Sequence, residues 1–117
     1  MFIALVVLTV LLAVLALNSA AMKLRKNEQV LASIHGTVGV PLRQLPVLAG
    51  LEIAGAIGIL IGLWPEPLGV AAAIGLVAYF IGALIGHLRV GDTKGAAAPV
   101  VPLLLSIAVL VLRLLTV

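Results

Sequence analysis

The sequence predicts an all-α, polytopic integral membrane protein in which four transmembrane helices form an antiparallel bundle, with a short interfacial helix in the first loop. Hydrophobic residues make up 64% of the 117 positions and charged residues only 9%, about a third of the roughly 25% usual for a soluble domain. The apolar positions gather into four stretches, each near the ~20 residues that cross a bilayer: residues 2–22, 45–64, 68–86 and 99–117. These stretches and their loops predict one transmembrane domain over residues 1–117.

The first predicted span, residues 2–22, is followed by basic residues rather than preceded by them. Lys23, Arg25 and Lys26 come directly after it, whereas a secretory signal carries its positive charge at the start. We therefore expect a membrane anchor whose charged end faces the cytoplasm, and not a cleaved leader.

The polar loop over residues 23–44 contains one stretch with helical potential. Residues 28–34 include the apolar pair Val30 and Ile34, four positions apart, which predicts one or two amphipathic turns at the membrane interface. Glycine and proline then disfavour regular structure, at Gly36, Gly39 and Pro41.

The second and third spans are joined by a short connection, residues 64–67. Trp64 suits the headgroup level, and Pro67 suits the first turn of a helix, where no hydrogen bond is lost. This connection predicts a tight antiparallel hairpin. The third span is followed by a polar loop, residues 87–98, and Arg113 in the last span lies within snorkelling reach of the far interface.

The charges of the loops predict the orientation of the chain. Six basic residues fall on one side of the membrane, whereas the opposite loop holds only the charge of Glu66. Positively charged loops face the cytoplasm, so loops 23–44 and 87–98 are predicted to be cytoplasmic and both termini extracytoplasmic. The six basic residues are Lys23, Arg25, Lys26, Arg43, Arg89 and Lys94.

Small residues at helical spacing mark the predicted helix contacts. Because lipid tails are as apolar as leucine, close backbone approach, rather than burial alone, holds transmembrane helices together. We expect such contacts along two stripes, which could face one another or form the seam of a homo-oligomer. The stripes are Gly50, Ala54, Gly58 and Gly62 in the second span and Ala78, Gly82 and Gly86 in the third.

Glu52 is the only acidic residue inside a predicted span. An ionisable group at such a position is costly and marks a candidate functional site. The alternative is a structural carboxylate paired with a basic neighbour. The candidate ligand-binding residues, which could converge on one polar pocket near the cytoplasmic face, are Glu52, His87, Asn18, Lys23, Arg89 and Tyr79.

Three of these candidates could instead have purely structural roles. His87 could simply complement the dipole at a helix C-terminus. Asn18 and Tyr79 are typical of hydrogen bonds between helices. The sequence leaves these alternatives open.

Several chemistries find no support in the sequence. The chain has no cysteine, which removes thiolate metal sites and thiol redox chemistry. One Glu and one His at unrelated positions do not predict a metal site, and the glycines lie inside apolar helices rather than in a nucleotide-binding loop. The basic residues are few and lack an aromatic platform, so nucleic acid is not an expected partner. No catalytic residue is assigned, which favours a protein without catalytic activity of its own.

Three motifs resemble the DoxX-like family of small four-helix bacterial membrane proteins. They are Ala21-Met22-Lys23-Leu24 at the end of the first span, Gly50-Leu51-Glu52-Ile53-Ala54-Gly55 in the second, and Gly86-His87-Leu88-Arg89-Val90-Gly91-Asp92 at the end of the third. The resemblance implies a bundle in the bacterial cytoplasmic membrane and an association with respiratory and redox enzymes, since the family takes its name from a subunit of a thiosulfate:quinone oxidoreductase. It also implies that the family's polar positions fall on Lys23, Glu52, His87 and Arg89.

Three functions remain in view. The first is a non-catalytic subunit or anchor of a redox-associated membrane complex, with the lipid bilayer and other membrane subunits, or further copies of the chain, as partners. The second is a protein that binds a quinone or another small amphiphile around Glu52 and His87, where a carboxylate and an imidazole could exchange protons with quinone oxygens. The third is a small transporter, which the low aromatic content of 3% disfavours. No intrinsic cofactor is expected, and a quinone is the cofactor that the second function would use.

Overall fold

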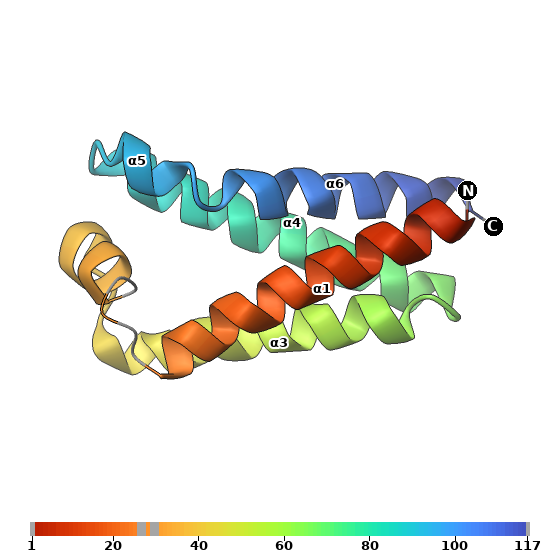
Figure 1. Cartoon of the computed structure of the whole chain (residues 1–117), viewed down its shortest axis with the longest axis horizontal. Helices are drawn as coiled ribbons and strands as arrows, with labels where there is room; N and C mark the ends of the chain where they lie inside the picture. The colour runs from red at the N-terminus through yellow and green to blue at the C-terminus, as the bar shows by residue number, and fades with distance from the viewer. Residues whose placement is uncertain (1, 26–27, 29–30, 117) are drawn as a thin grey trace.

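The computed structural model describes residues 2–25, 28 and 31–116, and over these residues it is built from helices joined by turns (Figure 1). The all-α prediction is therefore confirmed for the described part of the chain. The long helices are α1 (Phe2–Leu24), α3 (Leu45–Ile61), α4 (Glu66–Arg89) and α6 (Val100–Leu115); α5 (Thr93–Ala96), the π-helix η1 (Leu31–Val38) and the 3-10 turn η2 (Leu42–Gln44) are short.

Three helical stretches are long and apolar enough to cross a membrane: Phe2–Leu24, Glu66–Arg89 and Thr93–Leu115. Helix α3 is equally apolar in character but shorter, with 17 residues. Large apolar side chains point outward on all four long helices, among them Val14, Leu51, Ile74 and Leu104. Such an apolar exterior suits a lipid environment and not water, so the chain is a membrane protein.

The ends of helices α3 and α4 differ from the bounds predicted from the sequence. Helix α3 ends at Ile61, because the backbone turns at Gly62, and α4 begins at Glu66 with Pro67 in its first turn. At its other end α4 runs on to Arg89. As a result, His87 belongs to the last turn of α4 and not to a loop.

The first loop is helical over a longer stretch than predicted. The π-helix η1 covers Leu31–Val38, so Gly36 lies within it and does not end it. The chain reverses at Gly39, whose φ of 89° is a conformation that glycine adopts at little cost. The predicted interfacial helix over residues 28–34 includes residues 29–30, and these lie outside the described part of the chain, as does Lys26.

The long helices pack in a ring: α1 contacts α3, α3 contacts α4, α4 contacts α6, and α6 contacts α1. The two termini lie at one end of the molecule, and η1 and α5 lie at the other (Figure 1). The core between the helices is apolar and uses many small side chains. Its buried members are Leu5, Leu12, Ala13, Ala16, Ala56, Ile59, Ala73, Leu76, Phe80 and Val109.

Helices α3 and α4 approach most closely through glycines. A Cβ added at Gly62 would overlap the backbone of Gly69, and one added at Gly58 would lie 2.7 Å from the Cβ of Ala72. Because neither backbone can move aside, only a missing side chain permits this approach. The close contact therefore occupies the hairpin end of the two helices.

The other residues of the two predicted stripes lie outside this contact between α3 and α4. Gly50 and Gly82 have no neighbouring atom within 4 Å of an added Cβ, and Gly86 touches only Val38 of η1 at 3.4 Å. Ala54 and Ala78 are exposed. The two stripes do not face one another, because the spacing of four residues drifts round a helix of 3.6 residues per turn.

Arg113 reaches along the bundle to the ends of two helices. Its side chain is 7% exposed. Its Nε donates to the backbone oxygen of Gly62 at 3.1 Å, and its Nη1 donates to that of Thr116 at 2.8 Å. Gly62 and Thr116 are the C-caps of α3 and α6, where carbonyls lack a partner in their own helix, so the guanidinium satisfies two helix ends.

Candidate functional site

The buried ion pair between Lys23 and Glu52 joins α1 to α3. Lys23 Nζ lies 2.6 Å from Glu52 Oε1, and the two residues are 6% and 0% exposed. An isolated charge in such surroundings is costly, and a hydrogen-bonded opposite charge offsets most of that cost. The charged side chains therefore lock the loop end of α1 against α3.

Two hydroxyl groups complete the environment of the pair. The hydroxyl of Tyr79 on α4 donates to Glu52 Oε1 at 2.9 Å, and Ser19 Oγ lies 3.3 Å from the same oxygen while accepting from Lys23 Nζ at 2.7 Å. The Lys23 ammonium also lies 5.9 Å from the centre of the Tyr79 ring, within the range of a cation–π contact. Three helices thus meet at Glu52 Oε1.

The second carboxylate oxygen of Glu52 differs from the first in its hydrogen bonding. Glu52 Oε2 is buried and has no hydrogen-bond partner within the described residues. A buried polar atom without a partner is uncommon and costs free energy. The carboxylate therefore keeps one acceptor available beside the ion pair.

His87 forms a second polar pair at the same end of the molecule. Its Nδ1 lies 2.8 Å from Asp92 Oδ2, and the other oxygen of Asp92 accepts the backbone N–H of Gly95 at 2.9 Å. Asp92 is thereby the N-cap of the short helix α5. A carboxylate on Nδ1 fixes that nitrogen as the donor and orients the imidazole.

A cavity of about 720 Å³ lies at this end of the bundle, bounded by α1, η1, α4 and the start of α6. In Figure 1, α1 runs obliquely, from beside the C-terminal end of α6 toward the start of α3, so α1 and α6 diverge toward the loop end. The walls are mainly apolar, with Leu15, Leu48, Phe80 and Pro102 among them. The volume lies within the roughly 300–1,000 Å³ usual for pockets that bind small molecules.

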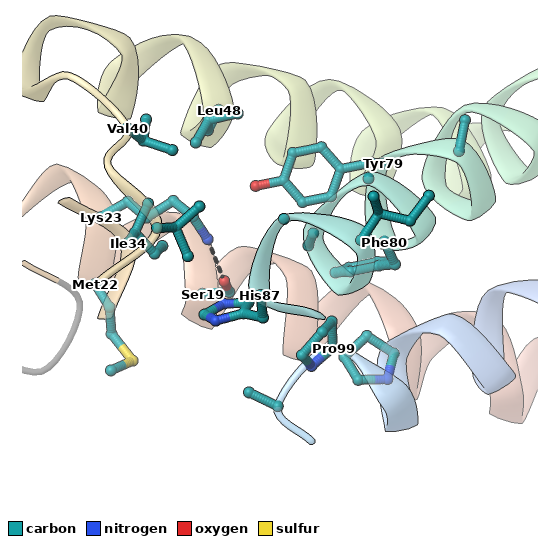
Figure 2. A pocket seen from close by; sticks show the side chains of 18 of the residues that line it. Ser19, Met22, Lys23, Ile34, Val40, Leu48, Tyr79, Phe80, His87 and Pro99 are labelled. Atoms are coloured by element: carbon teal, nitrogen blue, oxygen red, sulfur yellow. Dashed lines mark hydrogen bonds between the residues drawn. The ribbon is translucent and has the colours of Figure 1, made fainter. Parts of the chain in front are cut away.

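The structure brings five of the six candidate residues to this cavity: Asn18, Lys23, Tyr79, His87 and Arg89. Figure 2 shows Lys23 and Tyr79 directed toward one another, and His87 and Ser19 nearby. Glu52 is not part of the cavity wall, because it is fully buried behind the side chains of Lys23 and Tyr79. Its influence on the cavity is therefore indirect.

Sequence reasoning missed two partners, Ser19 and Asp92. Ser19 precedes Lys23 by one helical turn, a spacing at which side chains meet, so the pattern could have revealed it. Asp92 stands five residues after His87. Their contact depends on the turn at Gly91, whose φ is 74°, and sequence spacing alone does not predict that turn.

The Asp92 carboxyl should titrate below its ordinary pKa of 3.8. The hydrogen bond from Gly95, followed by that from His87, lowers the pKa of Asp92. Because the folded pKa lies below the unfolded one, the stabilisation is complete above about pH 4 and is lost as the pH falls through the folded value. Carbon-13 NMR of the labelled carboxyl checks this; Asp92→Asn identifies the signal, and a midpoint at or above 3.8 would contradict it.

The fold and its outward apolar side chains define an all-helical membrane protein with a polar cluster and a cavity at one end. Comparison with known families agrees: the sequence profile of the DoxX-like family matches residues 7–109, most of the chain. The chain belongs to the DoxX-like family. No curated protein and no solved structure matches it significantly.

Proposed function

We propose that this protein spans the membrane four times as an antiparallel bundle and binds a small amphiphile from the membrane in the cavity beside Lys23 and His87. The long axis of the molecule, 43 Å, is similar to the roughly 40–45 Å of a bilayer with its headgroups. The 17 residues of α3 reach the lower limit of about 17 for a span. A quinone is one amphiphile of suitable size.

The observation that supports binding is the form of the cavity. Apolar walls from α1, α4 and α6 meet polar groups at the loop end, where Lys23, His87 and Arg89 line it. A ligand with an apolar tail and a polar head would match both parts. Ligand pockets usually combine apolar walls with a few placed polar groups, and this cavity has that composition.

Filling the cavity should remove binding. Ala83 lines it, so in Ala83→Leu the larger side chain would occupy ligand volume and weaken binding about tenfold or more. Native mass spectrometry of the detergent-purified protein, with decylubiquinone or palmitate added, measures the bound fraction.

The matched control is Ala71→Leu, since Ala71 is exposed on the same helix and does not line the cavity. Ala71→Leu should bind like the unaltered protein. Unaltered binding in Ala83→Leu, or no binding of either probe to the unaltered chain, would contradict the proposal.

The proposed orientation puts loops 23–44 and 87–98 in the cytoplasm and both termini outside, in the cytoplasmic membrane of a bacterium. Arg25, Arg43, Arg89 and Lys94 are exposed at the loop end, and positive charge favours the cytoplasmic side. The chain reversal at Glu66 would then face outward.

Cysteine labelling tests this orientation directly, because the chain has no cysteine of its own. A membrane-impermeant maleimide applied to intact cells should label Glu66→Cys and leave Lys94→Cys unlabelled. After the cells are opened, both variants should react. Labelling of Lys94→Cys alone on intact cells would show the opposite orientation. Labelling of both variants on intact cells would contradict the four-span arrangement.

A second candidate function is that of an accessory subunit of a redox-associated membrane complex. Gly50 and Gly75 are exposed and have no neighbour within 4 Å of an added Cβ, which leaves small-residue surface suited to another transmembrane helix. Gentle purification from native membranes should then recover a larger enzyme in fixed ratio with this chain. Recovery of the chain alone would favour the amphiphile-binding function.

A further inference from the structure

The polar groups at the cavity are arranged by charge. Among the described residues, the cavity wall contains three basic side chains and no Asp or Glu. The three are Lys23, His87 and Arg89. Their acidic partners lie behind them. Glu52 is fully buried against Lys23, and Asp92, which pairs with His87 Nδ1, is not part of the cavity wall.

This arrangement leaves one positive charge without compensation. The charge of Lys23 is balanced by Glu52 at 2.6 Å, and His87 has the Asp92 carboxylate at 2.8 Å. Arg89 has no acidic partner among the described residues within salt-bridge distance. Its guanidinium carries five donors in a planar fork, which suits a carboxylate or a phosphate.

Lys23 has one further donor to offer. Two hydrogens of its ammonium are used by Glu52 and Ser19, and an ammonium has three. Since Lys23 lines the cavity, a head group that accepts hydrogen bonds could use the third. A cationic head would instead meet the uncompensated charge of Arg89 and could accept no hydrogen bond from Lys23.

From this geometry we infer that the cavity takes a single-chain amphiphile with an anionic head, a carboxylate or a phosphate, whose charge is balanced by Arg89 and which accepts a hydrogen bond from Lys23. The inference rests on the proposed amphiphile-binding function and narrows its ligand class. The apolar walls from Leu15, Leu48 and Phe80 receive the chain. The volume of about 720 Å³ matches a ligand of drug-like size, for which pockets of roughly 300–1,000 Å³ are usual.

The test compares four C16 ligands that differ only in the head: palmitate, hexadecyl phosphate, hexadecanol and hexadecylamine. Binding to the detergent-purified full chain is measured by native mass spectrometry. The two anions should bind about tenfold more tightly than the alcohol, with the amine weakest. The relative affinities of palmitate and hexadecyl phosphate then separate a fatty-acid source from a phosphate-bearing one.

Arg89→Gln should remove the preference for anions over hexadecanol, because the binding of palmitate and hexadecyl phosphate loses the guanidinium. Arg43→Gln is the matched control, because Arg43 is exposed at the same end but does not line the cavity; it should keep the full preference. Equal affinity for all four ligands, or an undiminished preference in Arg89→Gln, would overturn the inference.

Failure of the inference can be told apart from failure of amphiphile binding. If the unaltered protein binds the alcohol as tightly as the anions and Ala83→Leu loses both, the cavity binds amphiphiles without regard to the head. If no C16 ligand binds, or Ala83→Leu binds all four normally, both the inference and the proposed function are wrong.

Discussion

Replacing Lys23 by methionine should destabilise the protein by about 3–5 kcal/mol. The substitution removes the ammonium that lies 2.6 Å from Glu52 Oε1 and leaves a fully buried carboxylate facing only the hydroxyls of Tyr79 and Ser19. Methionine preserves the length of the apolar stem, so the loss comes mainly from the charge. Reversible unfolding in mixed micelles measures the change in the free energy of unfolding.

The double variant Lys23→Met with Glu52→Leu provides the decisive comparison. Removing both charges takes away the uncompensated carboxylate, and buried pairs are often replaced by apolar residues at little cost. The double variant should therefore recover most of the lost stability, whereas Arg25→Met, at an exposed position, should behave like the unaltered chain. A double variant as unstable as Lys23→Met would show that the cost does not come from an unpaired Glu52.

Gly62→Ala should cost about 3 kcal/mol or more, at the upper end of overpacking effects. The added methyl group would overlap the backbone of Gly69, and a backbone cannot rotate away as a side chain can. A shift of the Gly62 backbone away from Gly69 would also disturb the hydrogen bond from Arg113 to the Gly62 carbonyl. Thermal unfolding in detergent, followed by circular dichroism, measures the loss.

Gly50→Ala is the matched control on the same helix. Nothing lies within 4 Å of an added Cβ at Gly50, and alanine favours a helix interior over glycine by about 0.5–1 kcal/mol. The control should therefore be neutral or slightly stabilising. If the two variants unfold alike, glycine content and not the close approach to Gly69 sets the stability of this hairpin.

The helices could be predicted because composition and apolar stretches alone require them. A basic partner for Glu52 could be predicted, since a carboxylate in a span needs one, but not that this partner is Lys23. A polar pocket at this end could be predicted, but not its shape, because the shape depends on the oblique course of α1, which no local pattern encodes. Of the stripe on the second span, Gly58 and Gly62 lie in the close contact with α4, whereas Gly50 lies about three helical turns from Gly62 and the drift of each turn carries it out of that contact.

The partner of Arg113 could not be predicted from its distance to the chain end, which indicated only a position near an interface. In the structure Arg113 joins α6 to the end of α3. This partner is a backbone carbonyl, exposed by a turn at Gly62, and backbone acceptors leave no mark in the sequence. Charged residues in spans are therefore easier to locate than to pair.

The buried ion pair also has a consequence for biosynthesis. Lys23 lies in the last turn of α1, whereas its acid, Glu52, is synthesised 29 residues later, in the 17-residue helix α3. A short segment with a carboxylate would enter lipid poorly by itself. If α1 is already in the membrane, its ammonium should ease the insertion of α3, so the second segment should depend on the first.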